Sequence, residues 1–470
     1  MAHKRTMENP QQAFSSLELK PDLLSNLESL GYSTMTPIQA QSLPAILNNR
    51  DVIAQAKTGS GKTAAFGLGL LNQLKVSHYH VQALVLCPTR ELADQVAKEV
   101  RRLARQIHNI KVLVLCGGMP LGPQIGSLEH GAHIVVGTPG RIEEHLRKRT
   151  LQLNDLTMLV LDEADRMLDM GFQDAVERIV DVAPVERQTL LYSATYPPEI
   201  ESIADRVMNN PLSVQSDTSH NGQSIRQVFY LLPDQMTRLT GLQLLLLQSQ
   251  PQSSLVFCNT RAETQQVVDG LSQQGFSALA LHGDLEQCAR DQVLVRFANK
   301  SISILVATDV AARGLDIAEL DAVFNYQLSR DPQVHTHRVG RTGRAGNQGV
   351  AFSLYQETER YKLELLADSQ GHGLTTKQLP PLSILKRSPK RPLMATLQID
   401  GGKKQKVRPG DIVGALTGDQ GIVGKQIGKI DIFDNSAFVA VEHSAAKRAL
   451  RKISEGTLKG RSFRVRRIRG

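Results

Sequence analysis

The chain has 470 residues, of which 41% are hydrophobic, and its formal net charge is +9. This length is too great for one hydrophobic core, so at about 150 residues per domain we expect about three domains. No run reaches the roughly 18 apolar residues of a membrane span, and the N-terminus lacks the apolar core of a signal peptide. The composition therefore predicts a cytoplasmic protein without a membrane segment.

The positive charge is concentrated near the C-terminus. Residues 380–470 contain 20 Lys and Arg against 7 Asp and Glu, a balance of +13, whereas the preceding residues contain 35 against 39, a balance of −4. A basic module on a nearly neutral body is typical of a protein that binds a polyanion.

Short apolar runs alternate with amphipathic stretches between residues 50 and 215. The runs are DVIAQA, ALVLCP, VLVLCGG, HIVVGTPGR, MLVLDEAD and TLLYSAT. Continuous runs of this length, each followed by helix-forming sequence, predict parallel strands covered by helices on both faces. Ligands bind such open sheets at the carboxyl ends of the strands, where polar motifs follow each run.

The same alternation resumes after a polar segment at residues 216–224, which reads as a linker. Its apolar runs are QVFYLL, SLVFCNT, ALALHG, ISILVATD, AVFNYQL and VAFSLY. They predict a second α/β domain of similar build. A second Pro- and Lys-rich break then leads into the basic module.

The segment AQAKTGSGKTAAF, residues 54–66, follows a predicted strand and opens a helix. Its glycines let backbone N–H groups face phosphate oxygens, while Lys62 reaches the terminal phosphates and Thr63 can hold Mg²⁺. Ala56 occupies the first glycine position of the general pattern G-x-x-x-x-G-K-[ST]. The alternative is a Gly-rich turn into a helix.

The segment DEAD, residues 162–165, ends the apolar run MLVL. Asp162 at a strand end can hold Mg²⁺, and Glu163 can orient or deprotonate an attacking water. Acidic residues also simply favour a helix start. Together with Lys62 and Thr63, the segment favours the catalytic interpretation.

The order of these motifs resembles that of the DEAD-box RNA helicases from Phe14 to about Tyr355. The matching segments are GYSTMTPIQ, AKTGSGKT, PTREL, the Gly117–Gly118 pair, TPGR, DEAD, SAT, LVFCNT, ATDVAARGLD and HRVGRTGR. The resemblance implies two tandem RecA-like parallel-sheet domains that close on ATP, with Mg²⁺ as the metal.

The resemblance also implies the residues of the ATP site. The catalytic residues would be Lys62, Glu163 and the arginine fingers Arg341 and Arg344. The ATP-binding residues would be Phe14, which stacks on adenine, Gln39, which reads its edge, the loop Ala56, Lys57, Thr58, Gly59, Ser60, Gly61, Lys62 and Thr63, and Asp316 at the ribose. Thr63 and Asp162 would hold the metal.

The remaining motifs resemble those that contact RNA or couple hydrolysis to strand separation. The core's RNA-binding residues would be Pro88, Thr89, Arg90, Gly118, Thr138, Arg141 and Thr308, which suit backbone oxygens and carry little base information. The coupling residues would be Asp165, Ser193, Thr195 and His337. Two positions depart from the family near the cleft, Gln327 and His335, and we expect His335 to be structural.

A β-α-β-β-α-β order can be read from residue 393 onward, in MATLQI, RPGDIVGALTG, KIDIF, AFVAV, AAKRALRKI and SFRVRRI. Pro409 is tolerated in the first turn of the first helix, and Gly418 ends it. The order fits a small α+β domain like an RNA-recognition motif. Its first strand offers Thr396 and Gln398 where such modules carry stacking aromatics, so base stacking on the sheet is not favoured.

The stretch IDGGKKQKVRPGDIVGALTG, residues 399–418, could be a phosphate loop, a linker or a basic loop. It lacks G-K-[ST], and its apolar residues have the spacing of a packed helix, so the basic loop is favoured. We expect RNA contacts from Lys403, Lys404, Lys406 and Arg408.

This tail resembles the C-terminal module of the bacterial DbpA subfamily. The resemblance implies recognition of a hairpin of large-subunit (23S) ribosomal RNA, in pre-ribosomal particles, by a helicase that remodels short duplexes during assembly of the large subunit. A generic basic tail is the alternative reading. Two other functions remain open at this point: a DNA helicase or translocase, and an ATP-closed RNA clamp that does not unwind.

The expected domain plan has six parts, with a monomer as the default. They are a flexible N-terminus (1–13), a RecA-like ATP-binding domain (14–215), a linker (216–224), a RecA-like C-terminal helicase domain (225–368), a linker (369–392) and an RNA-binding domain (393–470).

Overall fold

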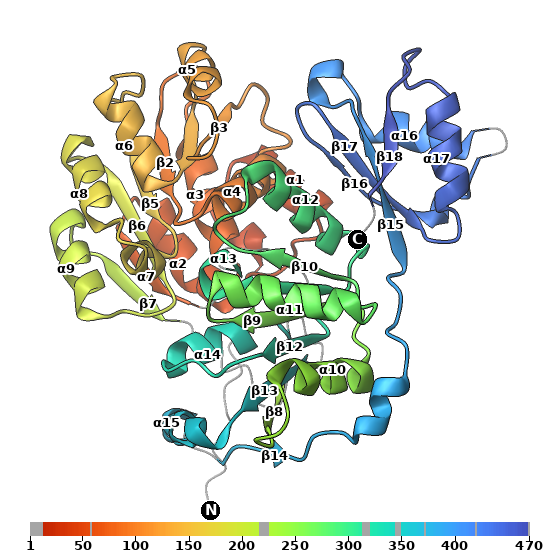
Figure 1. The fold of residues 1–470 in the computed structure, drawn as a ribbon. Helices are drawn as coiled ribbons and strands as arrows, with labels where there is room; N and C mark the ends of the chain where they lie inside the picture. Colours follow the sequence, from red (N-terminus) through yellow and green to blue (C-terminus); the bar gives the residue numbers. More distant parts are fainter. Residues whose placement is uncertain are drawn as a thin grey trace, which may run out of the picture. The chain divides into compact units, whose positions relative to one another are not determined.

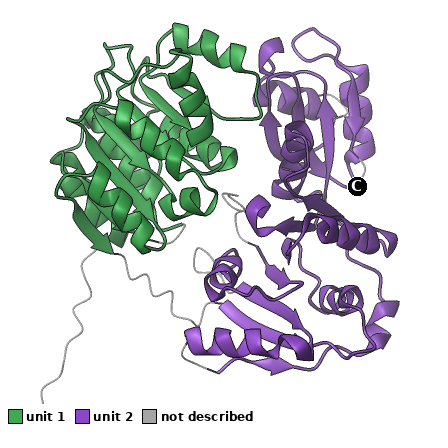
Figure 2. Ribbon diagram, turned by 60° about the vertical axis from the view of Figure 1, so that its left-hand side comes forward, with its two compact units in different colours: residues 1–219, 314–316 green, residues 220–313, 317–470 purple. Residues whose placement is uncertain are grey.

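The computed structural model describes residues 13–56, 59–215, 225–312, 320–343, 349–370, 373–418 and 421–468. These residues form two compact units, green and purple in Figure 2, the first from residues 13–215 and the second from residues 225–468. Among the described residues, no helix combines the length and the apolar character that a membrane span needs.

The first unit contains a sheet of seven parallel strands in the order β3-β4-β2-β5-β6-β1-β7. The strands are β1 (Val52–Gln55), β2 (Ala83–Leu86), β3 (Val112–Leu115), β4 (Ile134–Gly137), β5 (Met158–Leu161), β6 (Gln188–Ser193) and β7 (Leu212–Gln215). The helical segments are η1 (Phe14–Ser16), α1 (Pro21–Ser29), α2 (Pro37–Leu47), α3 (Lys62–Gln73), α4 (Arg90–Leu103), α5 (Leu121–Glu129), α6 (Pro139–Arg147), α7 (Ala164–Asp169), α8 (Gln173–Val182) and α9 (Pro198–Val207). Six strands confirm the predicted runs, and the partly exposed edge strand β7 is an addition.

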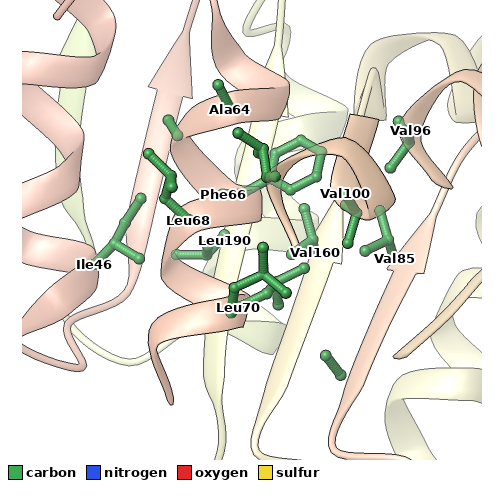
Figure 3. Packing of buried hydrophobic residues seen from close by; sticks show 14 of the residues in the cluster. Ile46, Ala64, Phe66, Leu68, Leu70, Val85, Val96, Val100, Val160 and Leu190 are labelled. Carbon is green, nitrogen blue, oxygen red and sulfur yellow. The ribbon is translucent and has the colours of Figure 1, made fainter. Parts of the chain in front are cut away.

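Helices cover both faces of this sheet, which explains why its strands are apolar throughout. Successive residues of a strand point to opposite faces. Val85 of β2 accordingly packs in one core with α2, α3 and α4, and its neighbour Leu84 packs in another with α6, α8 and α9. Figure 3 shows the first core, in which Phe66 and Leu70 of α3 lie against Val160 of β5. Burial on both faces therefore produces the continuous hydrophobic pattern.

The second unit contains another sheet of seven parallel strands, in the order β10-β11-β9-β12-β13-β8-β14. The strands are β8 (Ile225–Leu231), β9 (Ser254–Cys258), β10 (Ala278–Leu281), β11 (Ile304–Thr308), β12 (Ala322–Asn325), β13 (Gly349–Tyr355) and β14 (Thr376–Lys377). The helical segments are α10 (Arg238–Ser249), α11 (Arg261–Gln273), α12 (Gln287–Ala298), α13 (Asp309–Ala312), α14 (Pro332–Val339), η2 (Glu357–Glu359) and α15 (Arg360–Gln370). Counted from its first strand, this sheet has the same strand order as the sheet of the first unit.

The segment expected to be a linker after residue 368 has structure of its own. Helix α15 continues to Gln370, and β14 pairs with β8 as the edge strand of the second sheet. The short helical turn η3 (Leu382–Lys386) then inserts Ile384 between Leu244 and Leu247 of α10. The approach to the C-terminal module is therefore packed along the second sheet domain. The expected linker at residues 216–224 and N-terminal residues 1–12 lie outside the described residues.

The C-terminal module is a four-stranded antiparallel sheet with two helices on one face (Figure 1). Its elements are β15 (Met394–Ile399), η4 (Lys403–Gln405), α16 (Pro409–Thr417), η5 (Gly424–Gln426), β16 (Ile427–Ile432), β17 (Ala437–Glu442), α17 (Ala446–Glu455) and β18 (Val465–Arg467), with the strands in the order β16-β17-β15-β18. This confirms the predicted β-α-β-β-α-β order, including the helix that ends at Gly418. The core lies between Leu397 and Val439 of the sheet and Ile412 of α16.

The second sheet domain contacts the outer face of this small sheet at β15. Thr396 of β15 is 1% exposed, and its hydroxyl lies 2.7 Å from Ser301 Oγ and 2.9 Å from Asn299 Nδ2. Phe438, which is paired with Gln398 across β15 and β17, is 6% exposed. The face that carries stacking aromatics in RNA-recognition motifs is thus a protein contact here.

Candidate active site

The loop between β1 and α3 has the backbone that a phosphate site needs. Gly59 and Gly61 have φ angles of +87° and +95°, which side chains rarely adopt. A Cβ atom on Gly61 would also lie 2.5 Å from Nε2 of Gln39. Lys62 then begins α3, so the N–H groups of the loop and of the helix N-terminus lie at the same end of α3, where they can bind a phosphate together. Lys57 and Thr58 of the same loop lie outside the described residues.

Helix α2 holds this loop through Gln39, which is 1% exposed. Its Oε1 accepts a hydrogen bond from Thr36 N at 2.9 Å, and its Nε2 donates to Gly61 O at 3.0 Å. The Thr36 hydroxyl donates to Ser60 O at 2.8 Å. The amide keeps one N–H and one lone pair beyond these bonds. Gln39 is therefore positioned beside the phosphate loop with hydrogen-bonding capacity left.

Phe14 differs from what an adenine-stacking ring would suggest. It is 2% exposed and lies edge-on to Tyr32, with ring centroids 6.1 Å apart. A buried ring offers no open face to a base in this state. The stacking role remains a prediction that requires Phe14 to expose a face when nucleotide binds.

Two oppositely charged side chains near the phosphate loop are buried, and each has an atom without a hydrogen-bond partner. Asp162 follows β5 and is 3% exposed, and Lys62 is 7% exposed. Oδ1 of Asp162 and Nζ of Lys62 each lack a hydrogen-bond partner among the described residues. Burial raises the pKa of Asp162 to about 6, against the opposing effect of the Lys62 charge. Unpaired buried groups of this kind fit phosphate oxygens and a Mg²⁺ ion that takes one or two protein ligands.

The backbone at Glu163 is in the left-handed region, with φ and ψ both at 52°. This conformation is uncommon for a residue with a side chain and costs of order 1 kcal/mol. It places Glu163, which is 8% exposed, at the turn between β5 and α7. Strain of this kind is concentrated at functional sites.

Asp165, Ser193 and Thr195 are brought together at the ends of β5 and β6. Oδ2 of Asp165 accepts from the backbone N–H and the hydroxyl of Thr195, at 3.0 and 2.9 Å. Its own N–H donates to Ser193 Oγ at 3.3 Å. His337, the fourth predicted coupling residue, lies on α14 in the second unit.

The predicted RNA residues of the first unit follow β2, β3 and β4, on the opposite half of the sheet from β5, β6 and β1. Thr89 after Pro88 caps α4 by accepting from Leu92 N, and Arg90 is the first residue of that helix. Gly118 has a φ angle of +72°. Thr138 precedes α6, and Arg141 donates to Met119 O at 3.0 Å. The loops with the predicted ATP-site residues and the loops with the predicted RNA-binding residues therefore lie at the same edge of the first sheet, on its two halves.

The predicted residues of the second unit are only partly described. Thr308 ends β11 and is 9% exposed, and its hydroxyl accepts from Ala311 N. Arg341 follows α14. Asp316 and Arg344 lie outside the described residues.

Arg338 is a buried residue of this region that the sequence interpretation missed. Its side chain is 2% exposed, and Nε and Nη2 each donate to the carboxylate of Asp309 at 2.6 Å. Nη2 also donates to Asn259 Oδ1 at 3.0 Å, and Nη1 donates to Gln327 O at 2.8 Å. The guanidinium thus joins the loops after β9, β11 and β12 to α14. No spacing in the sequence identifies it, because its partners come from separate motifs.

The two departures from the family pattern near the cleft, Gln327 and His335, both have partners in the structure. Gln327 donates its amide to Glu263 Oε1 at 2.7 Å. His335 is 0% exposed, stacks on Phe229 and bonds Gln227 through Nε2 at 3.0 Å. Burial lowers the pKa of His335 to about 4, so the ring is neutral at pH 7. These contacts support the expectation that His335 is structural.

The basic loop between β15 and α16 has a defined shape. Lys403 N donates to Phe433 O, and Lys404 N donates to Asp434 O, so the loop is fixed to the β16–β17 turn. A Cβ atom on Gly402 would lie 2.1 Å from Phe433 O. The side chains predicted to contact RNA are all exposed: Lys403, Lys404, Lys406 and Arg408.

Three family models match successive parts of the chain. They are the DEAD/DEAH box helicase at residues 36–203, the helicase conserved C-terminal domain at 236–346 and the DbpA RNA binding domain at 396–467. The first range includes β1 to β6, the second includes β9 to β12, and the third covers most of the small antiparallel sheet.

Known proteins are similar over most of the length. ATP-dependent RNA helicase DbpA from Escherichia coli (strain K12) is 53% identical over 455 residues, which cover 97% of this chain and 99% of that protein. DEAD-box ATP-dependent RNA helicase CshA from Bacillus subtilis (strain 168) is 40% identical over 78% of this chain and 74% of its own length. The structure of S. cerevisiae Dbp5 bound to RNA and ADP BeF3 covers 80% of this chain and 100% of its own, with a TM-score of 0.71 and 30% identity. The chain belongs to the DEAD-box ATP-dependent RNA helicases, in the DbpA subfamily.

Proposed function

We propose that this RNA-dependent ATPase remodels short duplexes in precursor large-subunit (23S) ribosomal RNA and is directed to a hairpin of that RNA by its C-terminal module. The observation that carries the proposal is the match of residues 396–467 to the DbpA RNA binding domain. We further propose that it acts as a monomer on pre-ribosomal particles in the cytoplasm.

The proposed ATP site is supported by the buried atoms without hydrogen-bond partners near the phosphate loop, Lys62 Nζ and Asp162 Oδ1. Lys62 would bind the terminal phosphates, and Glu163 would orient the attacking water. Mg²⁺, held by Thr63 and Asp162, would neutralise charge on the phosphate oxygens. Arg341 and Arg344 would stabilise the charge that develops on the transferred phosphoryl group. Gln39, which is already bonded to the loop at Gly61 O, would recognise adenine by hydrogen bonds from its remaining N–H and to its remaining lone pair.

The core would hold RNA by its backbone. The proposed contacts are Pro88, Thr89, Arg90, Gly118, Thr138, Arg141 and Thr308. Hydroxyl, guanidinium and backbone N–H groups recognise phosphate and 2′-hydroxyl oxygens, so these contacts would not select a sequence. Asp165, Ser193, Thr195 and His337 would couple the state of the ATP site to this RNA surface, and Asp316 would contact the ribose.

Selection of the hairpin would fall to the basic loop of the C-terminal module. The outer face of its sheet is partly occupied, since Thr396 bonds Asn299 and Ser301 of the second sheet domain. The loop carrying Lys403 and Lys404 is exposed and fixed in shape by the β16–β17 turn. A shaped cationic loop can match one RNA fold better than a flexible basic tail can.

The test compares ATP hydrolysis with RNA fragments of equal length, with and without the target hairpin. We expect the hairpin fragment to stimulate best. The paired change Lys403→Gln and Lys404→Gln should remove that preference and flatten the salt dependence of affinity by about one unit of slope for each lost phosphate contact. Equal stimulation by unrelated RNA would contradict the ribosomal part of the proposal.

Two controls separate the module from the motor. The paired change Lys447→Gln and Arg448→Gln removes the same charge from exposed positions of α17 and should keep the preference. Glu163→Gln should bind ATP and hairpin RNA normally but lose turnover. Retained turnover in Glu163→Gln would overturn the role assigned to that carboxylate.

A further inference from the structure

Two of the three loops proposed to hold RNA on the first unit lead into neighbouring helices. Gly117 and Gly118 follow β3 and precede α5, while Thr138 follows β4 and precedes α6. Because β3 and β4 are adjacent in the sheet, their loops emerge side by side at its carboxyl edge. Backbone contacts with one RNA strand require both loops at a fixed separation.

A chain of buried hydrogen bonds joins these helices just beneath the loops. Gln124 of α5 is 8% exposed, and its Nε2 donates to Cys116 O at 3.1 Å, directly before the Gly117–Gly118 pair. His145 of α6 is 0% exposed, and its Nε2 lies 3.1 Å from Gln124 Oε1. Its Nδ1 lies 2.8 Å from the hydroxyl of Thr150.

The bonds define the direction of the chain. Because Gln124 Nε2 donates to a carbonyl, its Oε1 must accept, and His145 Nε2 must carry the proton. Burial lowers the pKa of His145, which keeps the ring neutral at pH 7 and leaves Nδ1 as an acceptor for the Thr150 hydroxyl, which also lies 3.2 Å from His145 O. Gln124 Oε1 and both ring nitrogens of His145 thus each have a partner, as a rigid buried network requires.

A second link between the loops lies at the surface. Arg141 Nη1 donates to Met119 O at 3.0 Å, and Arg141 Nε pairs with Glu144 at 3.1 Å. When RNA phosphate competes for the guanidinium, this link weakens. The buried chain through Gln124 and His145 uses no group that RNA can reach, so it persists while RNA is bound.

We propose that Gln124 and His145 are positioning residues that hold the Gly117–Gly118 loop and the Thr138–Arg141 loop at the separation that RNA binding needs. The inference rests on the proposed function, because it assumes that these loops contact RNA. Neither side chain would touch RNA or nucleotide. Their removal would therefore weaken RNA binding while leaving the ATP site and the chemical step intact.

The experiment is a kinetic comparison of Gln124→Met with Gln73→Met in the full chain. Gln73 ends α3, and its Nε2 donates to Ile46 O at 3.2 Å and Gln188 Oε1 at 2.9 Å, near the amino ends of the strands. Both changes delete hydrogen bonds made by a glutamine of the first unit and keep side-chain length. The measurements are the RNA concentration for half-maximal ATPase stimulation, kcat at saturating RNA, KM for ATP and Tm.

For Gln124→Met we expect the half-maximal RNA concentration to rise about tenfold, with kcat and KM for ATP within twofold of the unchanged protein. Gln73→Met should lower Tm without changing the half-maximal RNA concentration. His145→Phe should reproduce Gln124→Met, and adding it to Gln124→Met should cause little further loss. His145→Gln, whose Nε2 can replace the imidazole N–H, should restore most of the affinity for RNA.

The inference is overturned if Gln124→Met and Gln73→Met require the same RNA concentration, or if KM for ATP rises in parallel. Should Gln124→Met fail to fold, the comparison of His145→Phe with His145→Gln decides, and equal RNA requirements in that pair also overturn it. An unchanged protein whose ATPase is not stimulated by RNA would instead refute the proposed function.

Discussion

Replacing Arg338 with methionine should loosen the second sheet domain far more than its single position suggests. The guanidinium is 2% exposed and makes two 2.6 Å bonds to Asp309, while the Asp309 side chain is 25% exposed. Removing one member of a buried ion pair costs about 3–5 kcal/mol. Water can partly solvate the remaining Asp309, so we expect the lower end, about 3 kcal/mol.

Amide hydrogen exchange measures this cost locally, which suits a chain with several domains. A loss of about 3 kcal/mol raises the opening constant of β9, β11 and α14 by about two orders of magnitude. Arg338→Met combined with Asp309→Asn should recover most of the protection, because it removes the uncompensated carboxylate.

Arg296 of α12 provides the matched control. It is 6% exposed, and the described residues include no ion-pair partner for it. Arg296→Met removes a similarly buried guanidinium but leaves no carboxylate without its ion-pair partner. It should therefore change amide hydrogen exchange little. Equal exchange in Arg338→Met and Arg296→Met would refute the reasoning that the pair with Asp309 organises these loops.

Three further outcomes can be measured. Burial raises the pKa of Asp162 to about 6, so the folded protein takes up a proton between about pH 7 and 5 while the unfolded chain, with an ordinary carboxyl, does not. The contribution of Asp162 to the free energy of unfolding should therefore increase as pH falls through that window. Below pH 6, the affinity for Mg²⁺ measured by calorimetry should drop about tenfold for each pH unit. Asp162→Asn should abolish both pH dependences. His335→Phe should leave ATPase activity within about twofold between pH 6 and 8, since burial keeps that ring neutral throughout; a changed pH profile would contradict a structural role. Gly402→Ala should lower the stability of the C-terminal module by about 1–3 kcal/mol and weaken hairpin binding, because the added Cβ would lie 2.1 Å from Phe433 O. Gly410→Ala, whose Cβ would meet nothing within 4 Å, should change neither the melting temperature nor hairpin binding.

Local pattern was sufficient to predict the elements that carry most of the site. Strands buried on both faces read as continuous apolar runs, so β1, β5 and β6 were predicted along with the polar residues at their ends. The grouping of Asp165, Ser193 and Thr195 was expected from the family resemblance, and hydrogen bonds join the three residues in the structure. The edge strands β7 and β14 were not predicted, because their residues are partly exposed and the two-residue β14 is too short to show a pattern.

Contacts between distant segments could not be predicted in the same way. Arg338 meets Asp309 and Asn259 only after three strands are placed side by side, and no periodicity marks it. Gln124 and His145 look like ordinary residues of amphipathic helices. The burial of Phe14 and Thr396 likewise depends on packing partners far along the chain.

The covered face of the small C-terminal sheet determines how portable that module is. Detaching residues 393–470 would expose Thr396 on the sheet surface and leave Asn299 without its hydrogen-bond partner. A chimaera that moves this module to another helicase core would keep the hydrogen bonds of Thr396 only if the recipient also supplied matching groups at the positions of Asn299 and Ser301. The module and the surface that carries Asn299 and Ser301 therefore have to be transferred together if this contact is to be kept.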